Sequence, residues 1–353
     1  MTRVRVAGVG TCLPREALDN QALSAMVGEL PPSILPEIGV TTRYWIARPG
    51  EEEHATSASR MAAEALSRAA ESAGASAREV DLLVLSTSSP EYHLPGASTY
   101  VLDHVGAPRA ATIELRAGCT GMPVALDIAR SHLLAGRART VAVVGVEAIS
   151  PAIVGMVEGR GDKGLSIRQR LAAYTFGDGA GAVILTVEPG DRGPYTFVQG
   201  TLDATLPPGI RVVGGGTHLP VSQQDPSSLL RIDLDPKGSQ IHGPEVLAAC
   251  VDHLRAVGRG LESVDHIVLP EGEAEYFAAQ VVSGAVDVDP RHYREKVRQN
   301  LDDVGATGSA AVSLALADSL ARREISDGEG VLLLGIEGAR YQYAAIAADW
   351  PHL

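Results

Sequence analysis

The stretch that decides the fold of this chain is Arg116-Ala117-Gly118-Cys119-Thr120-Gly121-Met122-Pro123. The apolar residues 111–115 before it predict a buried strand, and the amphipathic pattern of 122–134 predicts a helix. Cys119 is therefore expected where a strand turns into a helix N-terminus. Unpaired backbone N–H groups and the positive end of the helix dipole favour a thiolate at such a place.

The residues around this cysteine support a reactive thiol. Gly118 and Gly121 allow a sharp turn that leaves the sulfur uncovered. Pro123 suits the first helical turn, where its missing N–H removes no hydrogen bond. A free cysteine is often just a small buried apolar residue, but glycines on both sides and a helix directly after Cys119 favour a nucleophile.

Composition limits the class of protein. A chain of 353 residues with 45% hydrophobic but only 4% aromatic residues needs a large aliphatic core. The net charge of −13 argues against nucleic acid or an anionic membrane surface as a partner. No apolar stretch approaches the ~20 residues of a membrane span. The three cysteines have neither metal-ligand spacing nor a disulfide framework, so we expect a cytoplasmic protein, with Cys12 packed in its core.

The pattern of predicted elements occurs twice along the chain. The first half shows helix 55–73, strand 80–86, the Cys119 strand and helix, and strand 140–146; the second shows helix 245–257, strand 266–269, helix 274–282, a helix to 321, strand 331–334, a turn at 335–339 and strand 341–348. This duplication predicts an α/β fold of two similar stacked halves, an N-terminal half over 1–188 that carries the nucleophile and a C-terminal half over 189–353.

Three other segments interrupt this pattern. Residues 18–50 are expected to be irregular because Pro31, Pro32 and Pro36 block a long helix, and 150–173 form a charged insertion. The glycine-rich run 176–185 lacks the Lys-Ser/Thr of a phosphate loop and leads into a strand, so it predicts a tight turn that Asp178 ties together.

The Ala-Gly-Cys-Thr-Gly turn at 117–121, the Phe-Gly-Asp-Gly-Ala-Gly-Ala run at 176–182 and the order of the two halves resemble the thiolase superfamily, and within it β-ketoacyl-acyl-carrier-protein synthase III. The resemblance covers nearly the whole chain. It implies a five-layered αβαβα thiolase-like fold and a homodimer. It also implies that Cys119 takes an acyl group as a thioester, in an oxyanion hole made by its own N–H and that of Gly338.

Two motifs of that family are altered here. Its His-x-x-Asn motif aligns with 270–274, which puts Glu271 in place of the histidine and Ala274 in place of the asparagine; its second asparagine aligns with Ala306. Glutamate and alanine cannot donate hydrogen bonds to a developing enolate oxygen, which argues against malonyl decarboxylation. Related acyltransferases place a histidine at the Ala306 position and an aspartate at the Ala311 position, and this chain does not match them either.

A different base is therefore expected. Glu271 could deprotonate an amine, an alcohol or water if burial raises its pKa, and we favour it because a strand and a proline deliver it to the active-site end. Glu273 is the nearby alternative, but acids at a helix start are commonly solvated. His242 aligns with a helix start lining the substrate tunnel of the family and either activates Cys119 or the acceptor, or caps the helix.

Further pocket candidates are weaker. His93 lies in a loop that reaches the dimer interface and neighbouring pocket in relatives, and a structural role is favoured; Ala306 lines the pocket by the same resemblance. Glu337 replaces a residue that is glycine in relatives, so it either brings a carboxylate near the oxyanion hole or caps a turn. His292 and Tyr293 are expected at the surface.

The sequence thus predicts an acyltransferase that moves an acyl group through Cys119 to an O, N or C acceptor. The Trp and Arg that hold coenzyme A in relatives have no clear equivalents around 31–42, so a carrier-protein thioester fits as a donor as well as a coenzyme A thioester. We expect no metal, flavin or nicotinamide cofactor. The expected partners are a second copy of the chain, acyl carrier protein and a small-molecule acceptor. The alternatives are an atypical C–C condensing enzyme with a carboxylate base, a thioester hydrolase, and a non-catalytic partner subunit of a condensing enzyme.

Overall fold

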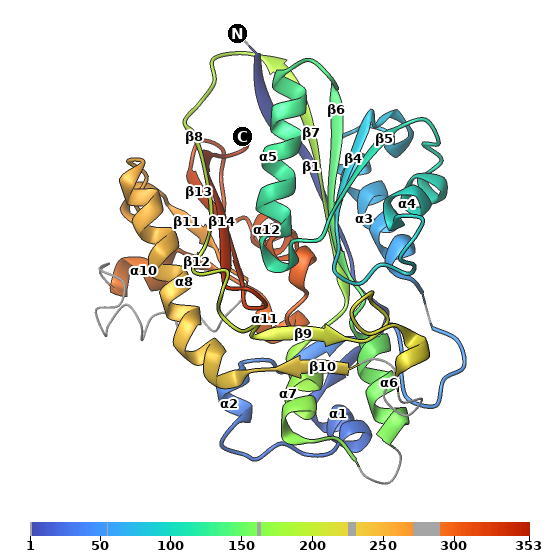
Figure 1. The fold of residues 1–353 in the computed structure, drawn as a ribbon. Helices are drawn as coiled ribbons and strands as arrows, with labels where there is room; N and C mark the ends of the chain where they lie inside the picture. The colour runs from blue at the N-terminus through green and yellow to red at the C-terminus, as the bar shows by residue number, and fades with distance from the viewer. Residues whose placement is uncertain (1, 55, 161–163, 225–230, 271–289) are drawn as a thin grey trace.

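Two five-stranded sheets stack with helices between and outside them, which gives five layers (Figure 1). The computed structural model describes residues 2–54, 56–160, 164–224, 231–270 and 290–353. The predicted αβαβα architecture is confirmed. The boundary predicted after residue 188 falls one residue before the end of β7 (Gly179–Pro189), and the division of the chain at that residue stays a prediction.

The first sheet has the order β1-β7-β6-β4-β5. Its inner strands are buried and rich in Val, Leu and Ala, as expected for strands covered on both faces. Pairing is antiparallel from β1 to β7 and from β7 to β6, and parallel from β6 through β4 to β5. The bounds besides those of β7 are β1 Thr2–Cys12, β4 Leu82–Ser86, β5 Ala111–Leu115 and β6 Thr140–Glu147.

The second sheet repeats this topology, with the order β8-β14-β13-β11-β12 when read from its antiparallel edge. The first two pairings are again antiparallel and the last two parallel. Thus β6 and β13 hold equivalent central places, as do β4 and β11. The bounds are β8 Tyr195–Thr201, β11 His266–Val268, β12 Val297–Arg298, β13 Gly330–Glu337 and β14 Gln342–Asp349.

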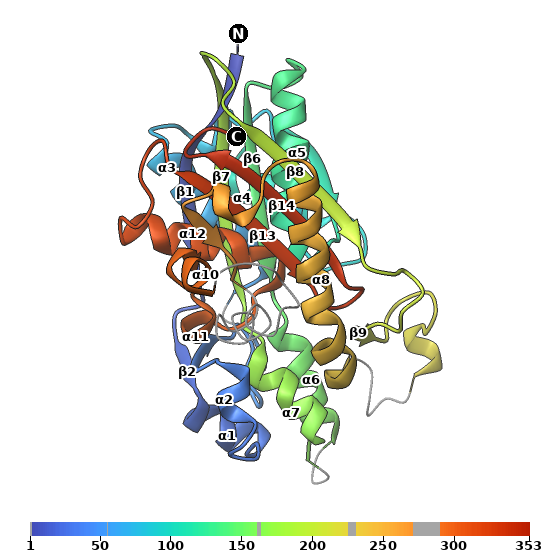
Figure 2. The same cartoon turned by 90° about the vertical axis from the view of Figure 1, so that its left-hand side faces the viewer.

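Helices form the other three layers (Figures 1 and 2). The central pair packs between the sheets, in a core cluster that includes Met122, Leu126, Val312 and Leu316. One outer layer covers the first sheet through alanine-rich α3, and α8 covers the second. The bounds are α5 Gly121–Leu134 and α12 Ala311–Ala321 in the middle, α3 Ala58–Ser72 and α4 Ala97–Val105 on the first sheet, and α8 Pro236–Ala256 and α10 Pro290–Lys296 on the second, with the short α11 Leu301–Val304 before α12.

Residues 18–50 and 150–173 gather with residues 210–213 and 231–234 at one end of the two sheets, at the bottom of Figures 1 and 2, whereas the glycine-rich run becomes part of β7. They share a core cluster of their own, so the expectation of an irregular 18–50 is wrong in part. The prolines do prevent a long helix, but Asn20–Val27 before them fits a short one with an Asp19 cap. The elements are β2 Ala17–Asp19, α1 Asn20–Val27, α2 Leu35–Ile38, β3 Thr42–Tyr44, α6 Ser150–Arg160, α7 Ile167–Thr175, β9 Ile210–Val213 and β10 Arg231–Leu234.

Two further expectations for the second half are corrected. Helix α8 begins at Pro236 and not near residue 245, because apolar packing of Val246, Leu247 and Cys250 outweighs the hydrogen bond lost at the internal Pro244. Tyr293 is 1% exposed and belongs to the core cluster under α8, whereas its charged neighbours led us to expect the surface. The predicted helix 274–282 lies outside the described residues. No helix of the described part of the chain is long and apolar enough to cross a membrane.

Candidate active site

The nucleophile turn, residues 117–121, connects β5 to α5 as predicted, but β5 is an edge strand with Ala111, Thr112 and Glu114 exposed and not the buried strand that we expected. Gly118 has φ +51°, a conformation that favours glycine, and residues 118–120 form a single 3-10 turn before the helix begins. The Thr120 hydroxyl donates to the Ala117 carbonyl at 2.7 Å and closes this turn. Cys119 is half-buried at the N-terminal end of α5, so the structure gives it the position that favours a thiolate.

The two other cysteines are core residues. Burial, together with the nearby Glu64 carboxylate, raises the pKa of the Cys12 thiol to about 12. Burial alone raises the pKa of Cys250 to about 12. Both thiols therefore stay protonated at neutral pH, and Cys119 is the cysteine placed for nucleophilic chemistry, because only a thiolate attacks efficiently.

The end of β13 packs against the nucleophile turn. A Cβ at Gly335 would lie only 2.4 Å from the Cys119 carbonyl oxygen, so the strand touches the turn backbone to backbone. A Cβ at Gly118 would lie 2.9 Å from Cγ of Glu337, whose side chain therefore covers the glycine that makes the turn. The last residues of β13 before Gly338 therefore lie against the backbone of the nucleophile turn.

Glu337 fulfils both readings of its role. Its side chain contacts the nucleophile turn, and its carboxylate also caps the next turn by accepting the N–H groups of Ala339 at 2.7 Å and Arg340 at 2.9 Å. Burial raises the pKa of this carboxyl group, while the two N–H groups and the Arg340 charge oppose the shift. Among the described residues, none accepts a hydrogen bond from the Gly338 N–H.

Glu147 is a buried carboxylate that the sequence analysis missed. It ends β6 and is 1% exposed. It accepts the Ser88 N–H at 2.9 Å, the Ser89 hydroxyl at 2.5 Å and the Ser309 hydroxyl at 2.8 Å. The Ser309 oxygen also lies 3.1 Å from the Gly118 carbonyl oxygen. A chain of polar contacts thus runs from Glu147 to the nucleophile turn.

An internal repeat in the sequence could have revealed this group. Val-Gly-Val-Glu at 144–147 parallels Leu-Gly-Ile-Glu at 334–337, and Gly308-Ser309 parallels Gly118-Cys119. The equivalent residues make equivalent contacts in the structure. Gly145 lies against the Ser309 carbonyl as Gly335 lies against the Cys119 carbonyl. Gly308 also has a left-handed φ of +48°, close to the +51° of Gly118. Glu147 is therefore the first-half counterpart of Glu337.

The side chain of Asp178 binds two other segments of the chain, whereas we expected it to tie its own glycine turn together. Its fully buried carboxylate accepts the N–H groups of Ile46 at 2.8 Å, Ile149 at 2.6 Å and Ser150 at 2.9 Å, and the Ser150 hydroxyl as well. Burial raises its pKa, and these hydrogen bonds oppose the shift. The Asp178 side chain therefore joins the glycine-rich run to the segment that contains Ile46 and to the segment that contains Ile149 and Ser150.

The predicted histidines lie apart from one another. His242 lies within α8, not at its start, with Nδ1 2.7 Å from Glu245 Oε2 and its ring edge-on to Tyr341. Its helix-capping interpretation is therefore wrong. His93 is exposed, and a Cβ at Gly215 would lie 3.7 Å from its Nε2.

Ala306 links the nucleophile region to the glycine-rich run. Its N–H donates to Thr175 at 2.8 Å, and its carbonyl accepts the Gly177 N–H at 3.1 Å. The side chain at this position is only a methyl group, so it contributes no donor to a pocket.

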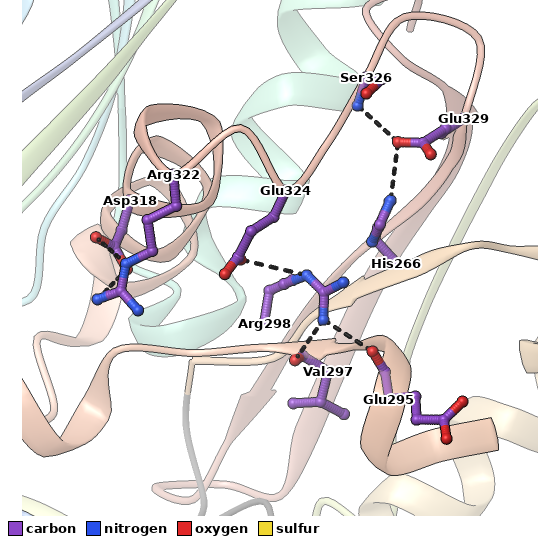
Figure 3. A network of polar contacts seen from close by, with 9 residues as sticks. All are labelled: His266, Glu295, Val297, Arg298, Asp318, Arg322, Glu324, Ser326 and Glu329. Carbon is purple, nitrogen blue, oxygen red and sulfur yellow. Dashed lines mark hydrogen bonds and ion pairs between the residues drawn. The ribbon is translucent and has the colours of Figure 1, made fainter. Parts of the chain in front are cut away.

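Glu271 and Glu273 lie outside the described residues, but the strands on either side of that segment are anchored (Figure 3). His266 at the start of β11 has its Nε2 2.9 Å from Glu329 Oε2. Arg298 of β12 forms an ion pair with Glu324 and donates to the carbonyl oxygens of Glu295 and Val297, the residues just before it. The entry to and exit from this segment are thus fixed in the second sheet.

Comparison with known proteins agrees with this geometry. The family model of 3-oxoacyl-[acyl-carrier-protein] synthase III matches residues 113–201, which include the nucleophile turn. β-Ketoacyl-[acyl-carrier-protein] synthase III of Gloeobacter violaceus is 30% identical over 367 residues, which cover 100% of both chains. The enzyme of the same name from Rhodospirillum centenum is 29% identical over 358 residues, 98% of each chain.

Solved structures show the same arrangement. 3-Oxoacyl-(acyl carrier protein) synthase III of Pseudomonas aeruginosa has a TM-score of 0.79 and 26% identity, and the match covers 99% of this chain and 98% of that one. The priming β-ketosynthase from the R1128 polyketide pathway has a TM-score of 0.79 and 25% identity, covering 99% and 96% of the two chains.

Proposed function

The chain belongs to the β-ketoacyl-acyl-carrier-protein synthase III family, and we propose that it is an acyltransferase that carries an acyl group on Cys119 without decarboxylating malonate. The Cys119 thiolate attacks the carbonyl carbon of a thioester, and the thiol of the donor leaves when the tetrahedral intermediate collapses. An acceptor oxygen, nitrogen or carbon then attacks the carbonyl carbon of the Cys119 thioester. The acceptor keeps the acyl group, and the Cys119 thiolate is released.

The observation that carries this proposal is the packing of β13 on the nucleophile turn. Gly335 and Glu337, which precede Gly338, contact the turn that carries a half-buried thiol at a helix N-terminus, and this contact supports Gly338 as the second donor. Two backbone N–H donors facing one carbonyl oxygen stabilise the tetrahedral intermediate of acyl transfer, and losing such a donor typically slows a reaction by ~100-fold or more. Acylation of Cys119 is the step that this arrangement serves.

The second half-reaction needs a base that is not the family's histidine. We propose Glu271 first, because a strand and a proline precede it, and His242 second. His242 contacts Tyr341, which follows the Gly338 turn, and its Nδ1 pairs with Glu245. A carboxylate on one imidazole nitrogen makes the other nitrogen a better proton acceptor.

Loss of the family's donors argues against decarboxylative condensation. Ala306 stands where the second asparagine aligns and has no hydrogen-bonding side chain. Glu271 would bring a negative charge toward an enolate, which raises the energy of that intermediate. An acceptor that arrives as an amine, an alcohol or an already acidic carbon avoids this difficulty.

We also propose a homodimer formed through the edge of the first sheet. β5 lies at that edge and leaves Ala111, Thr112 and Glu114 exposed. Glu114 accepts the Ser98 N–H at 2.9 Å, which holds the nearby loop containing the 86% exposed Leu94 beside this strand. An unpaired edge strand beside an apolar side chain is a surface that a second copy can cover. Acyl carrier protein is the proposed donor partner, with coenzyme A thioesters as the alternative.

Intact-protein mass spectrometry tests the function. Wild type and Cys119→Ala are each incubated with a panel of acyl-coenzyme A and acyl-carrier-protein thioesters. We expect a mass gain equal to the acyl group on wild type alone, and its loss on addition of the true acceptor. The proposal is refuted if no donor gives an adduct and if Cys119→Ala supports a partner condensing enzyme as well as wild type does. That result would favour a non-catalytic subunit.

A further inference from the structure

Glu337 is a buried acid that contacts the nucleophile turn. It is 7% exposed, it ends β13, and its Cγ and Oε1 would lie 2.9 and 3.3 Å from a Cβ at Gly118. The side chain therefore fills the space above the left-handed glycine of the nucleophile turn. A change in the position of Glu337 changes the surface on which that turn rests.

The hydrogen bonds of Glu337 leave out one N–H. One carboxylate oxygen accepts the N–H of Ala339 and the other accepts the N–H of Arg340. The N–H of Gly338, which follows Glu337 directly, donates to none of the described residues. The two bonds fold residues 337–340 back on the carboxylate. They also fix the plane of the peptide bond that carries the Gly338 N–H.

The first-half counterpart does not do this. Glu147 covers the left-handed Gly308 in the same way, because a Cβ there would lie 3.0 Å from its Cγ. Its acceptor oxygens, however, bind Ser88, Ser89 and Ser309, and the N–H of the next residue donates to Ser89 instead. Of the two glutamates, only Glu337, whose strand packs on the nucleophile turn, accepts hydrogen bonds from the turn that follows it. This difference separates the role of Glu337 from a general requirement of the fold.

We propose that Glu337 is a positioning residue that holds the Gly338 N–H in the oxyanion hole, facing the carbonyl oxygen of the acyl group on Cys119. The proposal rests on acylation of Cys119, the first half of the proposed function. In the intermediate, the carbonyl oxygen becomes an oxyanion that accepts the Gly338 N–H, while the carboxylate of Glu337 stays bound to the two N–H groups that follow. It exchanges no proton with the substrate.

Glu337→Gln tests this role, because it keeps the size of the side chain but turns one of its two acceptors into a donor. Glu147→Gln is the matched control at the equivalent strand end. Two rates are measured for Cys119 in each protein by mass spectrometry. Acylation by p-nitrophenyl acetate builds an oxyanion, whereas alkylation by iodoacetamide, measured at the high-pH plateau where the thiol is fully ionised, does not.

We expect the ratio of acylation to alkylation to fall by about 10- to 100-fold in Glu337→Gln and to stay within about threefold of wild type in Glu147→Gln. An unchanged ratio in Glu337→Gln overturns the proposal, as does an equal fall in both variants. The activated ester needs no carrier, so the proposal is tested even if no natural thioester acylates the protein. Wild-type Cys119 that reacts with the ester no faster than a free thiol of equal pKa also overturns it.

Discussion

Adding one methyl group to β13 should displace the nucleophile turn. In Gly335→Ala the new Cβ would lie 2.4 Å from the Cys119 carbonyl oxygen, whereas a carbon and a carbonyl oxygen normally approach no closer than about 3.3 Å. The turn or the strand must therefore move by about 0.9 Å. β13 is hydrogen-bonded to β11 on one side and β14 on the other, so we expect the turn to move.

Two consequences of different size follow. Overpacking of this kind typically costs about 1–3 kcal/mol of stability. A misplacement of about 1 Å in a catalytic group can reduce a rate by about 100-fold. We therefore expect Gly335→Ala to remain folded, with a urea midpoint slightly below that of wild type, but to acylate Cys119 about 100-fold more slowly in the mass-spectrometric time course.

Gly145→Ala is the control, because it makes the same change at the equivalent place in β6. Its Cβ would lie 1.9 Å from the Ser309 carbonyl oxygen, a closer approach than the one at Gly335, so its loss of stability should be at least as large. Its effect on acylation should be smaller, about tenfold or less, since Ser309 contacts the Gly118 carbonyl, whereas Gly335 lies directly against the backbone of Cys119. The reasoning is refuted if Gly335→Ala acylates within about threefold of wild type, or if Gly145→Ala is the slower of the two.

Two further predictions concern the buried carboxylates. Asp178→Ala leaves the N–H groups of Ile46, Ile149 and Ser150 without their acceptor, which costs about 1–3 kcal/mol of stability for each unsatisfied group. Removing the buried charge offsets part of this cost, so we expect urea unfolding to show a net loss of about 3 kcal/mol or more. A loss below about 1 kcal/mol would contradict the role assigned to Asp178. Burial raises the pKa of Glu147 above its ordinary 4.5, so its contribution to stability is full below that pH and declines as the pH rises toward the higher pKa of the folded state. The free energy of unfolding of Glu147→Gln, measured in urea between about pH 4.5 and 7.5, should therefore fall less steeply with pH than that of wild type, and equal slopes would count against a raised pKa.

The local parts of the site were predictable, because their signals lie within a few residues. Gly118, Cys119 and Pro123 mark a turn followed by a helix, and the apolar run before them marks the strand. Two similar α/β halves followed from the repeated order of helices and strands, and the resemblance to the thiolase superfamily implied their αβαβα stacking. These predictions depend on backbone conformation and hydrophobic period, which neighbouring residues determine.

The supporting contacts were not predictable in the same way, because they join distant parts of the chain. Glu147 meets Ser309 across 162 positions, and Asp178 meets Ile46 across 132. A glutamate at the end of an apolar strand looks like an ordinary solvated residue until the fold buries it. Helix α8 was shortened in the prediction for a related reason, since Pro244 is a local signal and the apolar packing that overrides it is tertiary.

The duplication gives the two halves equivalent turns that carry different side chains, one half-buried and one fully buried. Cys119 and Ser309 occupy equivalent turns, each beneath a glycine of a central strand. The Ser309 side chain is fully buried: its oxygen accepts the Ser86 hydroxyl at 3.1 Å, and its own proton faces Glu147 and the Gly118 carbonyl. A hydroxyl held on every side cannot approach a substrate. The second turn therefore buttresses the first, and the half-buried thiol of Cys119 stays the accessible nucleophile of the pair.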